Sequence, residues 1–385
     1  MPKIMSQWFS FRPEFTSFVI DAERHSKYLF GNEDRALRDE LVLSLKECSY
    51  SQRGQHAIIY GNAGRGKTHL ANHLVWSARN TKDDEFALEL VYVDCPPISS
   101  AKAPISSFFA NILRSVPVDV VKRIVNSFLK VCETNPTAKD RVTKALQNNG
   151  AIYSVLESMG IGTEKYLKSA LGWLGGDVEP QIATQFEVPK QLTDEGQITR
   201  NIAALAEMLL VGEGKNLIFL IDEAERLQTI TSGEQYYVWL SALRQLFRKP
   251  PLGLILFVIA KNRDDVPQVL WEEEISSVIG TNNIHECSNF AKQQAESFLK
   301  ELLECLIDRT TQTVIDAVAE AGEKVETYPF TAEAFDDFVT HHTIGTSTSI
   351  PREIINSLER SARRAMTLNK KLIDSDVLRQ VIEGI

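Results

Sequence analysis

Four short apolar runs recur along the chain and predict strands. They are Ala57 to Tyr60, Leu90 to Val93, Leu217 to Ile221 and Leu254 to Ile259. The last two have the length and the branched side chains that are typical of parallel strands buried on both faces. Between the runs, apolar residues recur at the spacing of a helix. This alternation predicts an α/β fold, in which helices sandwich a parallel sheet.

Two regions depart from this alternation. Between about residues 117 and 196, helical stripes are interrupted by glycines and an Asn-Pro pair, which predicts a helical insertion. From residue 291 onward, every apolar stripe has helical spacing. We therefore expect a lead-in at 1–27, an α/β domain at 28–290 that contains the insertion, and a second, helical domain at 291–385.

Composition excludes several classes of protein. A chain of 385 residues, 43% of them hydrophobic, can bury a core without disulfides. A formal net charge of -9 argues against coating nucleic acid by bulk charge. Five scattered cysteines without a Cys-x-x-Cys pair predict reduced thiols in a cytoplasmic protein. No apolar run approaches the ~20 residues that a bilayer needs, and no secretory signal is visible, so we expect no membrane partner.

A glycine-rich segment follows the first predicted strand and precedes a helical pattern. It reads Gly61-Asn62-Ala63-Gly64-Arg65-Gly66-Lys67-Thr68, which matches G-x-x-x-x-G-K-[ST]. The glycines let backbone N–H groups face the β- and γ-phosphates of a nucleotide, and the helix N-terminus adds a positive dipole. Lys67 supplies a charge to the phosphates, and the Thr68 hydroxyl is offered to Mg²⁺. The segment predicts an ATP site with bound Mg²⁺.

Two histidines follow this motif on the same predicted helix. His69 directly follows Thr68, which favours a position near the phosphates. His69 and His73 also have the i, i+4 spacing of a helical metal site, but no third ligand lies nearby in the sequence.

The strand Leu217 to Ile221 ends in two carboxylates, Asp222 and Glu223. Asp222 would hold Mg²⁺ through its water shell, and Glu223 would polarise the attacking water. Alone, such a pair could be a helix N-cap. Together with the phosphate loop, it indicates ATP hydrolysis.

These two motifs together resemble the AAA+ branch of P-loop ATPases, over about residues 28 to 381. The resemblance implies that Asn262, after the strand Leu254 to Ala260, orients the hydrolytic water as the sensor-1 residue. It also implies that Ser349-Ile350-Pro351-Arg352-Glu353 is the sensor-2 turn of a C-terminal helical lid, with Arg352 over the γ-phosphate.

Narrower likenesses concern the branch of the family. Phe30-Gly31-Asn32-Glu33 resembles the box that begins the core of replication-initiator and STAND-type ATPases, which implies that Gly31 and Asn32 lie near the adenine. Leu171 to Gly176, Leu192 to Asp194 and Tyr328 to Phe330 are similar to segments of the ATP-binding proteins of BREX-type phage-defence systems. Transposition-regulator ATPases share the same core and compete for the assignment.

AAA+ active sites usually also need an arginine from a neighbouring subunit, so the resemblance implies a homo-oligomer. This arginine often follows the sensor-1 strand, but the segment from Asp264 to Asn289 contains none. The nearest candidates are Arg244, Arg248 and Arg263, and the choice among them stays open.

The resulting hypothesis is a Mg²⁺-dependent AAA+ ATPase that drives assembly or remodelling in a DNA transaction, with phage defence first and transposition control second. Its partners would be further copies of the chain, an effector or a nuclease- or transposase-type protein, and duplex DNA. The alternative is a STAND-like switch, whose nucleotide state gates a protein partner without nucleic acid. The acidic composition favours the switch. The segment 351–371, with six cations and two carboxylates, favours DNA.

Overall fold

A computed structural model describes residues 4–51, 55–80, 88–98, 105–231, 233–249, 251–343 and 349–384, with only the backbone for 47–51. The chain forms two compact units. Unit 1 comprises Met1–Arg38, Gly61–His73 and Cys287–Ile385, and unit 2 comprises Asp39–Tyr60 and Leu74–Glu286. Two helices, α2 (Asn32–Ser51) and α3 (Lys67–Asn80), contribute residues to both units.

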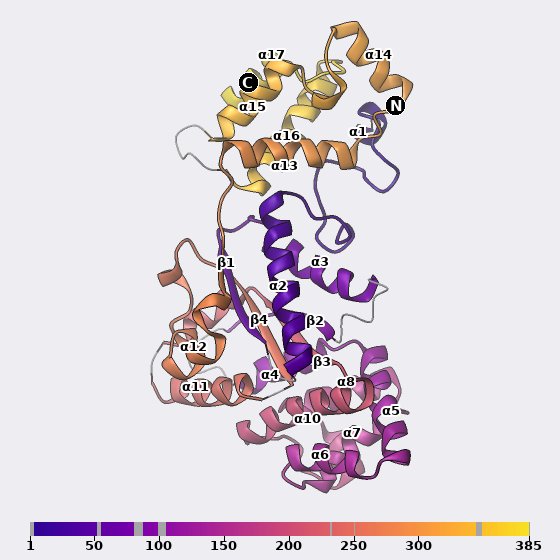
Figure 1. Cartoon of the computed structure of the whole chain (residues 1–385), viewed down its shortest axis with the longest axis vertical. Helices are drawn as coiled ribbons and strands as arrows, with labels where there is room; N and C mark the ends of the chain where they lie inside the picture. Colours follow the sequence, from indigo (N-terminus) through magenta and orange to yellow (C-terminus); the bar gives the residue numbers. More distant parts are fainter. Residues whose placement is uncertain are drawn as a thin grey trace. The chain divides into compact units, whose positions relative to one another are not determined.

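A five-stranded parallel sheet is the framework of unit 2 (Figure 1). Its strands are β1 (His56–Gly61), β2 (Leu88–Asp94), β3 (Asn216–Asp222), β4 (Leu252–Ile259) and β5 (Ile284–Cys287), in the order β2-β3-β4-β1-β5. In the register of β2 and β3, Asp94 is the partner of Asp222. The carboxyl ends of these two strands therefore meet at one edge of the sheet.

The four strands predicted from the apolar runs are confirmed, each with two or three further residues. Strand β5 was not predicted, because it has four residues and only Cys287 is buried. Its His285 and Glu286 leave no apolar run to recognise.

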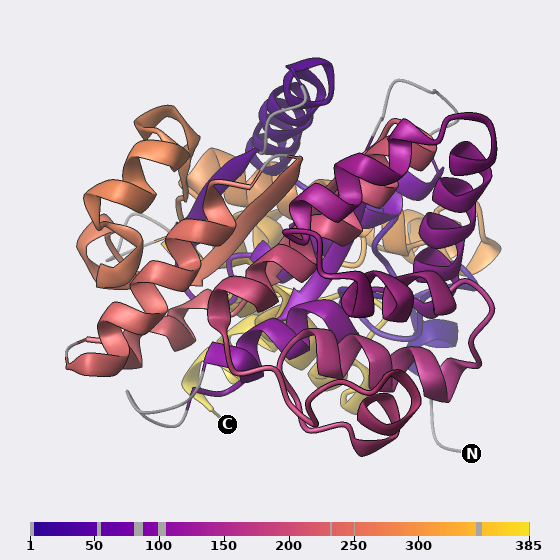
Figure 2. The same cartoon turned by 90° about the horizontal axis from the view of Figure 1, so that it is seen from below.

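Helices cover both faces of the sheet (Figure 2). Those of unit 2 are α4 (Ile105–Arg114), α5 (Val118–Thr134), α6 (Thr137–Ala145), α7 (Gly150–Ser158), α8 (Glu164–Leu174), α9 (Pro180–Phe186), α10 (Glu195–Glu213), α11 (Glu234–Phe247) and α12 (Glu273–Ile279). The predicted insertion is thus confirmed as helical, and it consists of α5 to α9.

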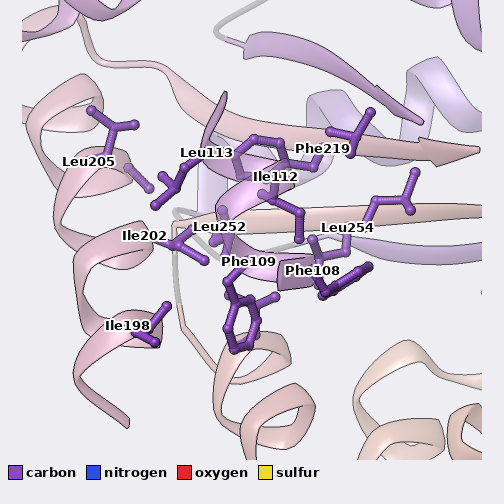
Figure 3. Packing of buried hydrophobic residues seen from close by; sticks show 14 of the residues in the cluster. Phe108, Phe109, Ile112, Leu113, Ile198, Ile202, Leu205, Phe219, Leu252 and Leu254 are labelled. Atoms are coloured by element: carbon purple, nitrogen blue, oxygen red, sulfur yellow. The ribbon is translucent and has the colours of Figure 1, made fainter. Parts of the chain in front are cut away.

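The insertion joins the core of unit 2 through α4 and α10. Figure 3 shows their apolar side chains beside those of the sheet: Phe108, Phe109, Ile112 and Leu113 of α4, Ile198, Ile202 and Leu205 of α10, and Phe219, Leu252 and Leu254 of the strands. Gly175, at the end of α8, lies against α4 so closely that a Cβ atom there would be 2.3 Å from Ala110 Cα. One continuous core therefore holds the insertion and the sheet.

Unit 1 is mainly helical. It contains α1 (Met5–Trp8), α13 (Lys292–Leu306), α14 (Gln312–Ala321), α15 (Ala332–Thr343), α16 (Pro351–Thr367) and α17 (Ser375–Glu383). The apolar faces of α13, α15, α16 and α17 form its core. The helices α13 to α17 lie in the segment that the sequence predicts to be all helical.

The aromatic lead-in is part of the same core. Phe9, Phe15 and Phe18 are buried among the C-terminal helices. The Trp8 indole donates to the Lys370 carbonyl at 3.1 Å, and the Phe18 N–H donates to the Glu359 carboxylate at 3.1 Å. These aromatic side chains of the lead-in are thus packed in the helical core.

None of the described helices is long and apolar enough to cross a bilayer. Four cysteines, Cys95, Cys132, Cys287 and Cys305, are free thiols. The side chain of Cys48 lies outside the description.

Candidate ATP site

The predicted phosphate loop directly follows β1, and α3 begins at its lysine. Gly64 and Gly66 have φ angles of +80° and +106°, which favour glycine. The Lys67 side chain is buried, and its ammonium donates to the carbonyls of Gly61 and Asn62 at 2.8 and 2.9 Å. The loop therefore curls around the charge that the motif provides for phosphates.

The first turn of α16 lies against this loop in unit 1. The Arg352 N–H donates to the Gly64 carbonyl at 3.3 Å. A Cβ atom on Gly64 would lie 2.7 Å from Arg352 Cβ and 3.2 Å from Arg352 Nε. Only glycine permits this approach. The structure thus brings together two predicted site residues that are far apart in the sequence.

The Arg65 side chain is directed toward α2 and the segment before α13. It is 2% exposed, pairs with Asp34 at 2.9 Å and lies 4.3 Å from the centre of the Phe290 ring. It also donates to the Ser288 carbonyl. Burial raises the pKa of Asp34, and the Arg65 charge opposes that rise. Arg65 therefore anchors the loop to α2 and to the segment before α13, while its backbone remains in the loop.

The predicted adenine box begins α2. Gly31 has φ +88° and donates its N–H to Glu301 at 2.9 Å. Glu301 also pairs with Arg35 at 2.7 Å, and Arg35 donates to the Asn32 side chain at 2.7 Å. These contacts fix Gly31 and Asn32 at the start of the helix.

Both histidines of α3 contact the chain that leads into α2. His69 Nε2 lies 2.6 Å from the Tyr28 carbonyl oxygen, and His73 Nδ1 lies 2.8 Å from the Ser26 carbonyl oxygen. Burial lowers the pKa of both side chains, which favours neutral rings. The His69 ring is stacked with Phe30 at 6.4 Å between centroids.

The other loop residues lie at its rim. The Asn62 side chain donates to Asn289 at 3.1 Å. Ala63 and Thr68 are exposed. Their positions leave the Thr68 hydroxyl accessible at the start of α3.

The predicted carboxylate pair ends β3 in unit 2. Asp222 is 4% exposed, and its carboxylate accepts from the Tyr92 hydroxyl and from the Glu223 N–H, each at 2.9 Å. Burial, and then the Asp222 charge, raise the pKa of Tyr92, so the hydroxyl remains a donor. Glu223 has φ 55°, an uncommon conformation for a residue with a side chain.

Arg226 was not predicted from the sequence. It lies on η1 (Ala224–Thr229) and forms an ion pair with Glu223. Its guanidinium also pairs with Asp94 at 3.1 Å and donates to the Cys95 carbonyl. The signal that could have found it is the i, i+3 spacing of Glu223 and Arg226, which allows a pair within one helical turn.

Asn262 follows β4, the strand beside β3. It is exposed, and it precedes η2 (Arg263–Asp265), where its N–H donates to Asp265 at 3.2 Å. The Glu225 carboxylate accepts from the N–H of Ile259 at 2.9 Å, which ties η1 to the end of β4. Asn262 and Glu223 thus follow adjacent parallel strands at the same edge of the sheet.

The three candidate arginines differ in their surroundings. Arg244 pairs with Glu274 at 3.0 Å, and the Arg263 guanidinium lies 4.9 Å from the Trp271 ring centre. Arg248 directly follows α11, is exposed and has no ion pair or ring contact with the described residues.

No group of three or more His, Cys, Asp or Glu side chains that could hold a metal is present in the described part of the chain. Mg²⁺ in ATPases is usually held by one or two carboxylates together with the phosphates of the substrate. A carboxylate such as Asp222 fits this mode of binding.

Comparisons with known proteins agree with this geometry at the level of the fold. No protein-family model and no curated protein matches the sequence. The chain is similar to the solved structure of the Aeropyrum pernix ORC2 protein in its ADPNP-ADP complexes, with a TM-score of 0.51 and 13% identity over 93% of this chain and 69% of that chain. This likeness shows an AAA+ fold.

Two further structures are similar with lower scores. CDC6P from Pyrobaculum aerophilum has a TM-score of 0.47 and 12% identity over 99% of this chain and 71% of that chain. The Thermotoga maritima RuvB Holliday junction branch migration motor has a TM-score of 0.41 and 12% identity over 92% of this chain and 70% of that chain.

The AAA+ fold class predicted from the sequence is confirmed by the sheet, the helical insertion and the helical lid.

The buried Arg65–Asp34 pair generates a prediction about stability. Asp34→Asn should lower the free energy of unfolding by about 3 kcal/mol, because it leaves a buried guanidinium without its carboxylate. Arg35→Gln is the matched control, since its pair with Glu301 is partly exposed and should contribute about 1 kcal/mol or less. Urea unfolding of both variants measures the difference. Equal losses would show that Arg65 does not depend on Asp34.

Proposed function

We propose that the chain is a Mg²⁺-dependent ATPase that uses ATP binding and hydrolysis in a DNA transaction. The observation that carries the proposal is the phosphate loop of unit 1, where Lys67 lies inside the curl of the loop and Arg352 lies against Gly64. A nucleotide phosphate at this loop would meet backbone N–H groups, an ammonium and a guanidinium. The AAA+ fold supports this assignment.

Each predicted site residue takes a role in this proposal. Lys67 and Arg352 neutralise the phosphates, Thr68 and Asp222 hold Mg²⁺, Glu223 accepts a proton from water, and Asn262 orients that water. Mg²⁺, when bound, neutralises charge on the phosphate oxygens. Gly31, Asn32 and His69 remain candidates for residues that lie near the bound nucleotide.

Two substitutions test the ATPase proposal. Lys67→Ala should abolish tight ATP binding, because it removes the cation at the centre of the loop. Glu223→Gln should retain binding and lose hydrolysis by at least about 100-fold, because an amide cannot accept the proton. Isothermal titration and phosphate release measure the two steps, with the exposed Lys168→Ala and Glu234→Gln as controls. Wild-type affinity in the first variant, or normal turnover in the second, would contradict the assigned role.

We propose duplex DNA as a partner, bound through one face of α16. Arg360 and Arg363 are exposed, and their spacing of three residues places them on one side of the helix, where Arg363 also pairs with Glu359 at 2.7 Å. Four other cations of this segment have contacts elsewhere: Arg352 lies against Gly64, Arg364 donates to Gln380, Lys370 pairs with Asp374, and Lys371 lies over Trp8. The basic surface is therefore narrower than the sequence suggests.

Charge reversal of Arg360 and Arg363 together tests this surface. Affinity for duplex DNA should fall, and the slope of log K against log salt should decrease by about two, because two phosphate contacts are lost. Arg379→Glu, the same change at an exposed site on α17, is the control. An unchanged slope would place any DNA contact elsewhere. Failure of the wild-type protein to bind DNA at low salt would favour the switch that acts on a protein partner.

We propose phage defence first, and transposition control second, as the process in which this ATPase acts. The STAND-like switch is the alternative from another functional class. The likeness to BREX-type proteins includes Leu171 to Gly176, where Trp173 is buried and donates to the Pro189 carbonyl at 2.8 Å. These residues pack α8 within the insertion. They therefore support a shared architecture but give no chemical evidence for a role in defence. An effector or a nuclease- or transposase-type protein encoded beside this chain would discriminate the settings.

We also propose that the active form is a homo-oligomer in which Arg248 of one copy serves the ATP of the next. Arg248 is exposed and has no ion pair or ring contact with the described residues, whereas Arg244 pairs with Glu274 and Arg263 lies over the Trp271 ring in their own unit. An arginine supplied in this way contributes ~10³ to 10⁵ in rate.

A mixing experiment tests the role of Arg248. Arg248→Ala should bind ATP but turn over slowly, and adding Lys67→Ala protein should partly restore turnover, because one protein supplies the loop and the other the arginine. Arg379→Ala is the control for loss of an exposed arginine. Turnover per subunit that is constant over a hundredfold dilution, with no effect of Arg248→Ala, would contradict the proposal.

A further inference from the structure

Arg65 belongs to the phosphate loop, but the proposed function gives its charge no role. Its side chain is 2% exposed and pairs with Asp34 Oδ1 at 2.9 Å. Its Nε donates to the Ser288 carbonyl, and its guanidinium carbon lies 4.3 Å from the centre of the Phe290 ring. The planar, forked guanidinium suits both a carboxylate and an aromatic face. Arg65 thus joins the loop to the segment that precedes α13.

The backbone of Phe290 is joined in turn to the segment before α16. Phe290 and Ser349 form an antiparallel bridge, in which the N–H of each residue donates to the carbonyl of the other at 2.8 Å. Both residues are buried. Pro351 is the first residue of α16, where its ring fixes one backbone angle in the helical range. The position of Phe290 therefore determines where α16 begins.

Arg352 follows Ser349 by three residues, a stretch that spans at most ~11 Å when fully extended. The Arg352 N–H donates to the Gly64 carbonyl at 3.3 Å, and a Cβ atom on Gly64 would lie 3.2 Å from Arg352 Nε. The Arg352 side chain is exposed and has no ion pair with the described residues. The contacts therefore form a closed cycle, in the order Arg65, Phe290, Ser349, Arg352 and Gly64.

We propose that Arg65 is a positioning residue, which aligns Arg352 with the phosphate loop and so sets how strongly the site prefers a nucleoside triphosphate to a diphosphate. The proposal rests on the role of Arg352 in the proposed function. A triphosphate offers a terminal phosphate to the Arg352 guanidinium, and a diphosphate lacks this group. Charge-assisted hydrogen bonds from a guanidinium to a phosphate depend on the alignment of the two groups. A change at Arg65 should therefore weaken binding of the triphosphate more than binding of the diphosphate.

A conservative substitution separates the position of Arg65 from its charge. Arg65→Lys keeps a positive charge beside Asp34 but removes the planar group that covers Phe290. The ratio of the affinity for ATP to the affinity for ADP should fall by about fivefold or more, the lower end of the coupling between linked sites. Arg352→Ala should also lower this ratio. Adding Arg65→Lys to Arg352→Ala should lower it no further, because Arg65 acts through Arg352.

Isothermal titration of the full chain measures this ratio in the presence of Mg²⁺. The ligands are ADP and the β,γ-imido analogue of ATP, whose bridging nitrogen resists hydrolysis. Arg309→Lys is the matched control, because Arg309 is a partly buried arginine of unit 1 that donates to the Glu326 carbonyl at 2.8 Å. The control should keep the wild-type ratio, since Arg309 lies outside the cycle of contacts.

Equal losses of affinity for both nucleotides in Arg65→Lys, or a further fall of the ratio in the double variant, would overturn the positioning role. If circular dichroism shows that Arg65→Lys does not fold, Phe290→Leu decides by the same ratio, because it keeps an apolar side chain but removes the aromatic face. A lower ratio in Arg352→Ala with none in Arg65→Lys would overturn only this inference. An unchanged ratio in Arg352→Ala would overturn the role of Arg352 in the proposed function, and this inference with it.

Discussion

The structure of unit 1 depends on the contacts of one buried arginine in the phosphate loop. A guanidinium that is withdrawn from water must have its charge and its hydrogen bonds satisfied, and Arg65 finds Asp34, the Ser288 carbonyl and the face of Phe290. These partners come from α2 and from the segment before α13. One side chain therefore fixes the loop relative to two distant parts of the chain, and the Gly64 carbonyl is thereby presented to α16.

Much of the fold could be predicted, because its core strands are unbroken apolar runs. The phosphate loop and the Asp222–Glu223 pair were found from the sequence because local motifs carry them. Strand β5 was missed because it is short and partly exposed, and pairing with β1 makes it a strand. The position of the aromatic lead-in could not be predicted from its sequence, because the long-range contacts of Phe9 and Phe18 with the C-terminal helices determine it.

The directions of the side chains at the candidate site could not be predicted from the sequence. Arg65 belongs to the motif by position, yet its guanidinium points to Asp34, thirty-one residues earlier. His69 follows the motif, yet its ring contacts the Tyr28 carbonyl. The pair of Arg226 with Glu223 has a recognisable spacing, but its contact with Asp94 depends on the register of β2 and β3. Such choices of partner are made by tertiary packing, which no local pattern records.

The packing of the lead-in with the last helices has a consequence for synthesis on the ribosome. Phe9 and Phe18 emerge before the helices that bury them, so the core of unit 1 cannot close until those helices have been made. The phosphate loop also cannot form all its contacts before then, since Ser288 and Arg352 are among its partners. The insertion, from α5 to α9, is continuous in sequence and can fold while the chain is still being made. The nascent chain thus gains its sheet and insertion before it gains the surroundings of its phosphate loop.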